Sequence, residues 1–279
     1  MLTDARIDRI VAAALEEDAP WGDVTGMHLI PAEATAEADL VAREPGVFSG
    51  GTVFAAAFRL TDPAIEVDVH VSEGDAFAAG DVLASVSGNA RGILAAERVG
   101  LNLVQRLSGI STLTAAFVAA VEGTGARIAD TRKTTPGLRM LERHAVRAGG
   151  GTNHRFSLSD AVMVKDNHVG ILSAHGIDLP AAFAEARLPH TMHVVIEVDR
   201  IDQIEAALEA GAHTVLLDNF PLDGLRAAVA LIGDRARTEA SGGVTLETVG
   251  EIARTGVDVI SVGALTHSAR ALDLGLDLR

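Results

Sequence analysis

Four short runs in the last third of the chain combine strand-like composition with regular spacing. They are VVIEV (194–198), TVLLD (214–218), RTEAS (237–241) and DVISVG (258–263). Each run except the last precedes a stretch with helical spacing of apolar positions, such as IDQIEAALEAGA. A polar residue or glycine closes each run, at intervals of 21, 23 and 22 residues: Glu197, Asp218, Ser241 and Gly263. This spacing fits one strand plus one helix. It predicts parallel strands in barrel order, with the closing residues at the carboxyl-terminal rim where such barrels hold their sites.

The first 120 residues mix helical and strand-like periods. Residues 3–18 and 52–60 have helical spacing, whereas residues 38–44 and 65–71 alternate like strands. A stretch with two Gly-Asp turns follows, and residues 90–120 form a long helical pattern interrupted near Ser108 and Gly109. We therefore predict a two-domain α/β protein, with an N-terminal α/β sandwich-like domain of sheet and helices at 1–109 and a (βα) barrel at 110–279.

Composition limits the classes of protein to consider. The 279 residues are 48% hydrophobic but only 3% aromatic, without tyrosine, so we expect a core of Ala, Val, Leu and Ile. Cysteine is absent, which excludes disulfides and Cys-ligated metals and suits a cytoplasmic protein. We find no signal peptide and no uncharged apolar run of about 18 residues, and so expect no membrane partner. The formal net charge of -15 argues against general nucleic-acid binding.

The positive charge of this acidic chain is concentrated in one segment, DTRKTTPGLRMLERHAVRAGGGTNHRFSLSDAVMVKDNH (130–168). With Arg127 included, it holds eight Lys and Arg residues against four carboxylates. The chain contains only two lysines, Lys133 and Lys165, and both lie here. Lys165 closes the apolar run AVMV, which is typical of a buried strand. Single cations on an acidic surface are ordinarily solvated or paired. This density beside the glycines at 149–151 instead favours a cationic pocket for a small polyanion.

Three blocks of this segment resemble the quinolinate phosphoribosyltransferase family of NAD biosynthesis: DTRKT with PGLR, then GGG with NHR, then KDNH. AERVGLNLVQRLSGIST upstream and LLDNF, EASGG and VGALTHS downstream are also similar to the family, so the resemblance covers nearly the whole chain. It implies an open, incomplete (βα) barrel whose last segment packs back toward the N-terminal domain. It also implies that quinolinate and 5-phosphoribosyl 1-diphosphate react to give nicotinate mononucleotide, pyrophosphate and carbon dioxide.

The resemblance assigns roles to particular residues. The expected catalytic residues are Lys165, Glu197 and Asp218, and the last two are also the expected Mg²⁺ ligands. The expected substrate-binding residues are Arg98, Thr131, Arg132, Lys133, His154, Arg155, Ser241, Gly242, Gly243 and Gly263. The chemistry of the substrates fits these residue types, because guanidinium groups bind carboxylates in a bidentate manner and glycine-rich loops before helices present N–H groups to phosphate.

Some of these assignments have competing explanations in the sequence. From the residues alone, a salt bridge with Glu97 or another acid is the favoured explanation of Arg98, whereas in the family the Arg of the AER motif enters the partner's active site. The resemblance thus implies a homodimer, or a dimer-based oligomer, with shared sites. Ordinary rim polarity or helix capping would also account for Glu197 and Asp218. The family often shows Glu-Val-Glu-Val at the first of these strands, but here Val195 replaces the first acid, so we assign the function to Glu197.

Two other functions fit parts of the sequence. One is a related phosphoribosyltransferase of the molybdenum-transport-associated type, which tends to vary the KDNH block that is intact here. The other is a non-catalytic anion-binding or carrier module, suggested by the two Gly-Asp turns. A carrier module would leave the clustered cations and the rim carboxylates unexplained.

Overall fold

The computed structural model describes residues 2–279, and the chain divides into two compact α/β units. The first unit contains the chain up to Ala115, together with Thr134–Gly150 and Leu265–Arg279. The second contains Ala116–Lys133 and Gly151–Ala264. Helix α4 (Ala90–Ala120) passes from the first unit into the second, so the predicted boundary between residues 109 and 110 lies inside a helix.

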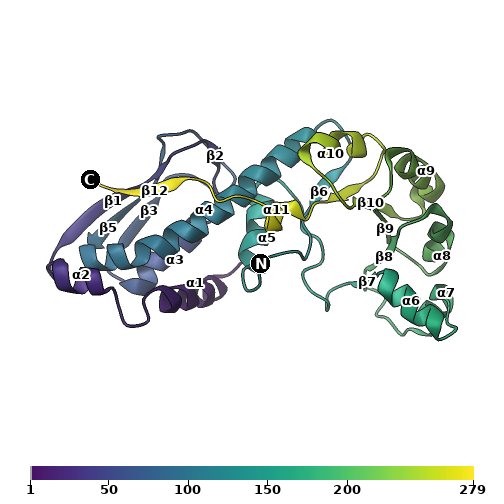
Figure 1. Ribbon diagram of the computed structural model, residues 1–279, viewed down its shortest axis with the longest axis horizontal. Helices are drawn as coiled ribbons and strands as arrows, with labels where there is room; N and C mark the ends of the chain where they lie inside the picture. The colour runs from purple at the N-terminus through teal and green to yellow at the C-terminus, as the bar shows by residue number, and fades with distance from the viewer. Residues whose placement is uncertain (1) are drawn as a thin grey trace. The chain divides into compact units, whose positions relative to one another are not determined.

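The first unit is built on an antiparallel sheet with the strand order β12-β1-β5-β3. These strands are β1 (Thr35–Ala42), β3 (Glu66–Val69), β5 (Val82–Asn89) and β12 (Leu274–Leu278). The C-terminal strand β12 lies along β1, with Leu278 opposite Ala38 and Leu274 opposite Ala42 (Figure 1). A two-stranded sheet pairs β2 (Gly46–Val47) with β4 (Ala76–Phe77). The remaining helices are α1 (Asp4–Asp18), α2 (Val24–Leu29), α3 (Gly51–Thr61), α5 (Arg139–Ala148) and α11 (Ala264–His267).

Phenylalanine contributes the largest buried side chains of the first unit, so the expectation of a purely aliphatic core is wrong there. Phe48, Phe54 and Phe58 are fully buried, and the rings of Phe54 and Phe58 meet edge to face with their centroids 4.9 Å apart. Gly100 on α4 faces this pair, and a Cβ at that position would come within 3.2 Å of Phe54. The 3% aromatic content of the chain conceals this arrangement because it averages over both units.

Helix α4 runs without a break through Ser108 and Gly109, where the sequence predicted an interruption. Gly109 is required by packing, since a Cβ there would lie 1.9 Å from the carbonyl oxygen of Arg270. By length and composition alone α4 is long and apolar enough to cross a membrane. Half of its most apolar 18-residue stretch is buried inside the protein. That is weak support for a membrane span, because the core helix of a soluble protein meets the same criterion.

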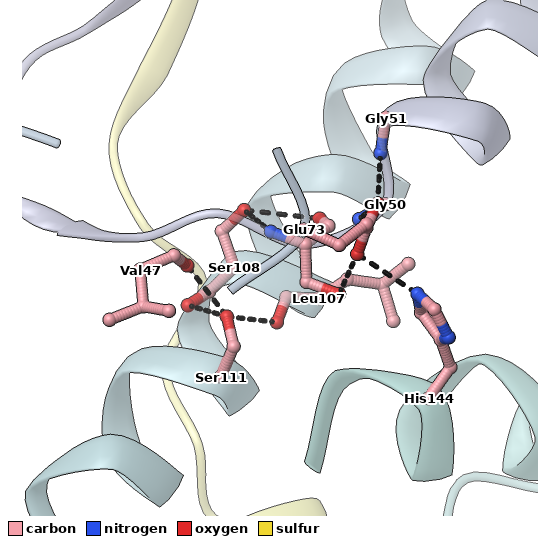
Figure 2. Close-up of polar contacts among 9 residues, drawn as sticks. Val47, Gly50, Gly51, Glu73, Leu107, Ser108, Ser111 and His144 are labelled. Atoms are coloured by element: carbon pink, nitrogen blue, oxygen red, sulfur yellow. Dashed lines mark hydrogen bonds and ion pairs between the residues drawn. The ribbon is translucent and has the colours of Figure 1, made fainter. Parts of the chain in front are cut away.

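The carboxylate of Glu73 caps the N-terminus of α3 (Figure 2). One of its oxygens accepts hydrogen bonds from the backbone N–H groups of Gly50, at 2.8 Å, and Gly51, at 2.9 Å. The other lies 2.9 Å from Ser49 Oγ and 2.9 Å from Nε2 of His144 on α5. A negative charge at this position satisfies N–H groups that the helix cannot pair internally and complements its dipole.

The second unit is built on a parallel sheet with the strand order β6-β11-β10-β9-β8-β7. The strands are β6 (Arg127–Ala129), β7 (Val162–Val164), β8 (Val194–Val198), β9 (Thr214–Asp218), β10 (Arg237–Ser241) and β11 (Val259–Ser261). Strand β6 pairs with β11, the last strand of the series, and not with β7, which follows it in the chain. The sheet therefore ends at β6 and β7, and the open barrel predicted from the sequence is confirmed.

The helices of the second unit alternate with its strands, and the connections after β8, β9 and β10 lie along the outside of the sheet (Figure 1). The α-helices are α6 (Asp166–Ala174), α7 (Leu179–Glu185), α8 (Ile204–Glu209), α9 (Leu222–Ile232) and α10 (Leu246–Ala253). Two 3₁₀ helices precede α8 and follow α9: η1 (Ile201–Gln203) and η2 (Gly233–Arg235). Strands β8, β9 and β10 have the predicted bounds, whereas β11 stops at Ser261, two residues before Gly263.

Candidate active site

The carboxyl ends of neighbouring strands bring the predicted rim residues together. Asp218 and Ser241 are the last residues of β9 and β10, and they are direct partners in the sheet register. Glu197 is the next-to-last residue of β8, and Lys165 directly follows β7. Parallel neighbours with equal register place these side chains at one edge of the sheet.

A cavity of about 380 Å³ opens at this edge. Nine predicted site residues line it: Thr131, Arg132, Lys133, His154, Arg155, Lys165, Glu197, Asp218 and Ser241. Its other lining residues, which the sequence did not predict, are Met163, Leu216, Glu239 and Ser261. The predicted glycines 242, 243 and 263 are not part of the lining but lie within two residues of Ser241 or Ser261. The cavity thus unites the cationic segment with the rim carboxylates.

Arg98 is the predicted residue that the second unit does not contain. It is exposed on α4, in the first unit. Within residues 2–279 no ion pair joins it to Glu97 or to another acid, so the salt bridge that competed with a functional role is not formed.

Lys165 and Glu197 form an ion pair inside the cavity, between Nζ and Oε2. The Glu197 side chain is the more buried of the two, with 14% exposed against 44% for Lys165. The backbone N–H of Lys165 donates to Nδ1 of His168 at 3.0 Å, in the first turn of α6. The KDNH block is therefore a strand-to-helix junction in which His168 fixes the backbone that carries the lysine.

His154 is held at both ring nitrogens. Its Nδ1 accepts the backbone N–H of Arg155 at 2.7 Å, and its Nε2 lies 3.2 Å from Oε2 of Glu239. Glu239 is only 3% exposed, and its other carboxylate oxygen accepts the hydroxyl of Ser261. The fully buried Asp130 accepts the backbone N–H of His154 at 2.7 Å. These contacts fix the NHR block against β6 and β10.

The guanidinium groups of Arg132 and Arg155 give the lining of the cavity positive charge. Burial, followed by the charge of Arg132, lowers the pKa of Arg155 from its ordinary value. Nε of Arg132 is buried and has no hydrogen-bond partner within residues 2–279. Because a buried donor without a partner is costly, this arrangement fits an anion that would supply acceptors.

The loop after β10 brings backbone N–H groups to the rim. Gly242 and Gly243 have φ angles of 96° and 58°, in the region that favours glycine. A Cβ at Gly242 would lie 2.1 Å from Oδ1 of Asn219, so the loop can approach the end of β9 only with glycine at this position. The loop leads into α10, which is the arrangement that the SGG sequence predicted.

The carboxylates suit a metal ion that is held jointly by the protein and a substrate, rather than one held by protein ligands alone. Within residues 2–279 no group of three or more His, Cys, Asp or Glu side chains could hold a metal ion. Glu197 and Asp218 both line the cavity, and Mg²⁺ is commonly held by one or two carboxylates together with substrate phosphate oxygens. The residues present therefore fit Mg²⁺ that arrives with a phosphorylated substrate.

Two family models match the sequence over nearly its whole length. The model described as "Quinolinate phosphoribosyl transferase, C-terminal domain" matches residues 110–277, and the corresponding N-terminal domain matches residues 23–108. The chain belongs to the quinolinate phosphoribosyltransferase family. The stretch with the Gly-Asp turns falls within this family's own N-terminal domain, which removes the main reason to consider a carrier module.

Similar proteins agree with the family. The chain is 44% identical over 291 residues to the nicotinate-nucleotide pyrophosphorylase [carboxylating] of Mycobacterium leprae, with 100% of both chains covered. It is 43% identical over 263 residues to a protein of Bacillus subtilis named probable nicotinate-nucleotide pyrophosphorylase [carboxylating], with 94% of this chain and 90% of that protein covered. The crystal structure of NadC from Streptococcus pyogenes superposes with a TM-score of 0.92 at 40% identity, and covers 100% of this chain and 99% of its own.

Glu239 and Ser261 are the polar residues of this quinolinate phosphoribosyltransferase family member that sequence reasoning missed. Side chains two residues apart on a strand face the same side. Glu239 is two residues before Ser241, and Ser261 is two residues before Gly263. Counting back two positions from each predicted rim residue would have located both.

Proposed function

We propose that this chain catalyses quinolinate phosphoribosyl transfer with decarboxylation, forming nicotinate mononucleotide, pyrophosphate and carbon dioxide. One observation carries the proposal: a single cavity is lined both by cations and by two rim carboxylates, namely Arg132, Lys133, Arg155, Lys165, Glu197 and Asp218. Both substrates are polyanions, and the ribosyl carbon becomes positively charged as the diphosphate departs. The cavity provides the complementary charge for each.

Quinolinate carries two adjacent carboxylates on a pyridine ring, and Arg132 and Arg155 provide the guanidinium groups for them. Burial, followed by the charge of Arg132, lowers the pKa of Arg155, and a bound anion would relieve both effects. Lys165 contributes further charge once a substrate carboxylate competes with Glu197 for its ammonium group. Met163 and Leu216 give the same cavity apolar surface for the ring.

The reaction consists of two bond exchanges. The ring nitrogen of quinolinate forms a bond to C1 of the ribosyl group, while the bond from C1 to the diphosphate oxygen breaks and the electron pair leaves with the diphosphate. The nitrogen is then positively charged, so the neighbouring carboxyl group can leave as carbon dioxide and its electron pair remains on the ring carbon. A proton completes that carbon, and no redox cofactor is needed.

The carboxylates Glu197 and Asp218 are suited to stabilise the ribosyl carbon as its positive charge develops. The same two residues would hold Mg²⁺, which supplies charge neutralisation for the departing diphosphate. Thr131 and Lys133 are suited to bind the diphosphate, and the backbone of Ser241, Gly242 and Gly243 with Gly263 to bind the 5-phosphate.

We further infer a homodimer in which Arg98 of one chain completes the site of the other. Arg98 is exposed and forms no ion pair within residues 2–279. Large apolar side chains are exposed around α2, including Trp21 at 89% and Leu29 at 75%. Exposed groups of this kind mark surfaces that bind another protein.

The test is to incubate the purified chain with quinolinate, 5-phosphoribosyl 1-diphosphate and Mg²⁺. We expect equal amounts of nicotinate mononucleotide and labelled carbon dioxide from carboxyl-labelled quinolinate. Phthalate, which has both carboxylates but no ring nitrogen, should inhibit without reacting. Absence of both products from folded protein would contradict the proposal.

A further inference from the structure

Asn219 has an unusual backbone conformation beside the candidate active site. Its φ is 58°, and it is the one residue other than glycine with a positive φ within residues 2–279. This left-handed region is sparsely populated by residues with a side chain, although asparagine tolerates it better than most. Such a conformation persists only where its surroundings enforce it, and it is often found at functional sites.

The contacts of Asn219 explain what enforces it. Its backbone N–H donates to the carbonyl oxygen of Ser241 at 2.8 Å, which ties the end of β9 to the end of β10. Its side-chain Nδ2 donates to Oδ2 of Asp218 at 2.7 Å. Its Oδ1 occupies the place that a Cβ on Gly242 would need, 2.1 Å away. Asn219 therefore contacts the rim carboxylate and the glycine loop at the same time.

The amide of Asn219 leaves half of the Asp218 carboxylate available. Within residues 2–279 no hydrogen bond reaches the other oxygen, Oδ1. Asp218 and Glu197 also line a second cavity of about 730 Å³, to which Asn219 itself contributes. The two carboxylates thus line both cavities, and the side chain that donates a hydrogen bond to Asp218 is that of Asn219.

We propose that Asn219 is a positioning residue that orients Asp218 and holds the Ser241–Gly243 loop for the phosphoribosyl donor. This inference rests on the proposed function, because it concerns the donor's half of the same site. It assigns Asn219 no contact with quinolinate. Loss of its amide should therefore impair use of the donor and of Mg²⁺, and spare the binding of quinolinate.

The first test is Asn219→Gly, which permits the same φ and removes the side chain with its amide. We expect kcat/KM for the phosphoribosyl donor to fall about tenfold, as for one hydrogen bond to a charged group. The Mg²⁺ concentration for half-maximal rate should rise, while the Kd of quinolinate by calorimetry stays within about twofold of the parent value. In Asn219→Asp, which keeps the shape but places a carboxylate against Asp218, the donor defect should be larger.

Asn89→Ala is the matched control, because Asn89 lies in the first unit and its amide donates to the Ala32 carbonyl at 2.7 Å. It loses a comparable hydrogen bond and should keep the parental kinetics. If Asn219→Gly uses the donor and Mg²⁺ as the parent does, the inference is wrong. It is equally wrong if both Asn219 variants weaken quinolinate binding in proportion to the donor defect. If the parent itself forms no nicotinate mononucleotide, the proposed function fails instead.

Discussion

At the scale of single residues, a compact ammonium group suits the position of Lys165 in the cavity. Lys165 directly follows a buried strand and pairs with Glu197. A partly exposed ion pair of this kind stabilises little, because solvent screens the attraction and ordering the two side chains costs entropy. Its value here lies in the two charges that it holds at a cavity until a substrate competes for them. A compact ammonium group fits that task, whereas a guanidinium group is wider and planar.

The first prediction is that Lys165→Arg lowers kcat/KM at least about tenfold although the charge is retained. The planar fork cannot occupy the space of the ammonium beside Glu197, and its fixed donors favour a different carboxylate geometry. Steady-state kinetics measures the effect. Arg226→Lys is the control, since Arg226 pairs with Asp223 on the exposed surface and should tolerate the reverse exchange. Parental turnover in Lys165→Arg would show that either cation serves.

The candidate site was predictable where it depends on strand spacing and less so where it depends on packing. Glu197, Asp218 and Ser241 follow from the regular interval between βα units, and all three line one cavity. Glu239 was missed because a buried carboxylate inside a strand has no signal in composition, and only the two-residue period of the strand points to it. The conformation of Asn219 depends on Ser241 and Gly242, which belong to the next βα unit, and local sequence does not specify that contact.

At the scale of elements, the cap of α3 is formed by a residue from another part of the first unit. Burial would raise the pKa of Glu73, but hydrogen bonds from His144 and Gly50 hold it below its usual value of 4.5. A carboxyl group with a lowered pKa stabilises the folded state when ionised. That contribution is complete above the unfolded pKa and disappears as the pH falls through the folded one.

The second prediction concerns the pH dependence of this cap. Glu73→Gln should lower the free energy of unfolding by about 1 to 2 kcal/mol at pH 7, because the charged acceptor at the helix N-terminus is lost. The difference between parent and variant should shrink as the pH falls below the usual pKa of 4.5, because the carboxylate is then protonated. Denaturant titrations at several pH values measure it, with the exposed Glu33→Gln as control. A difference that does not change with pH would contradict a role for the charge.

Two helical glycines of this chain differ in whether packing requires them. A Cβ at Gly109 in α4 would lie 1.9 Å from the carbonyl oxygen of Arg270, whereas one at Gly170 in α6 would meet nothing within 4 Å. The periodicity of α4 indicated a break at Gly109 because glycine weakens helices. Only the contact with Arg270, far away in sequence, shows that this glycine serves packing.

The third prediction compares these two positions. Gly109→Ala should destabilise the fold by about 1 to 3 kcal/mol, because overpacking outweighs the gain in helix propensity. Gly170→Ala should instead stabilise it by up to about 1 kcal/mol through propensity alone. The thermal unfolding midpoints of both variants and the parent show whether each substitution raises or lowers the stability. Equal shifts in the same direction would refute the packing explanation for Gly109.

At the scale of the whole molecule, an acidic protein has to attract two polyanions. The formal net charge of -15 repels such substrates at long range, so the cations of the 130–168 segment must reverse the potential locally. Arg98 lies outside that segment and outside the cavity lining, exposed on α4. In the proposed dimer, Arg98 adds one cation to the partner's site and removes none from the site of its own chain.

The last prediction tests that sharing directly. Arg98→Ala and Arg132→Ala chains should each be inactive alone, because every site in either homodimer lacks one of the two cations. After mixing and subunit exchange, a mixed dimer has one site with both defects and one with neither. Random exchange in an equimolar mixture makes about half of the dimers mixed, so about a quarter of the parental activity should return.

The alternative location of Arg98 gives a different result. If Arg98 acts only within its own chain, each chain of a mixed dimer still carries its own defect, and no combination of subunits restores a complete site. Exchange must be shown independently, for example by mass spectrometry of differently tagged chains, before activity is compared. Arg91→Ala is the control for general damage to α4, because Arg91 lies on the same helix and donates to the Ile30 carbonyl at 2.8 Å; this variant should be active without mixing with a second variant. Zero recovery after demonstrated exchange would place Arg98 outside the active site, whereas recovery near a quarter requires an arginine from one chain in the site of the other.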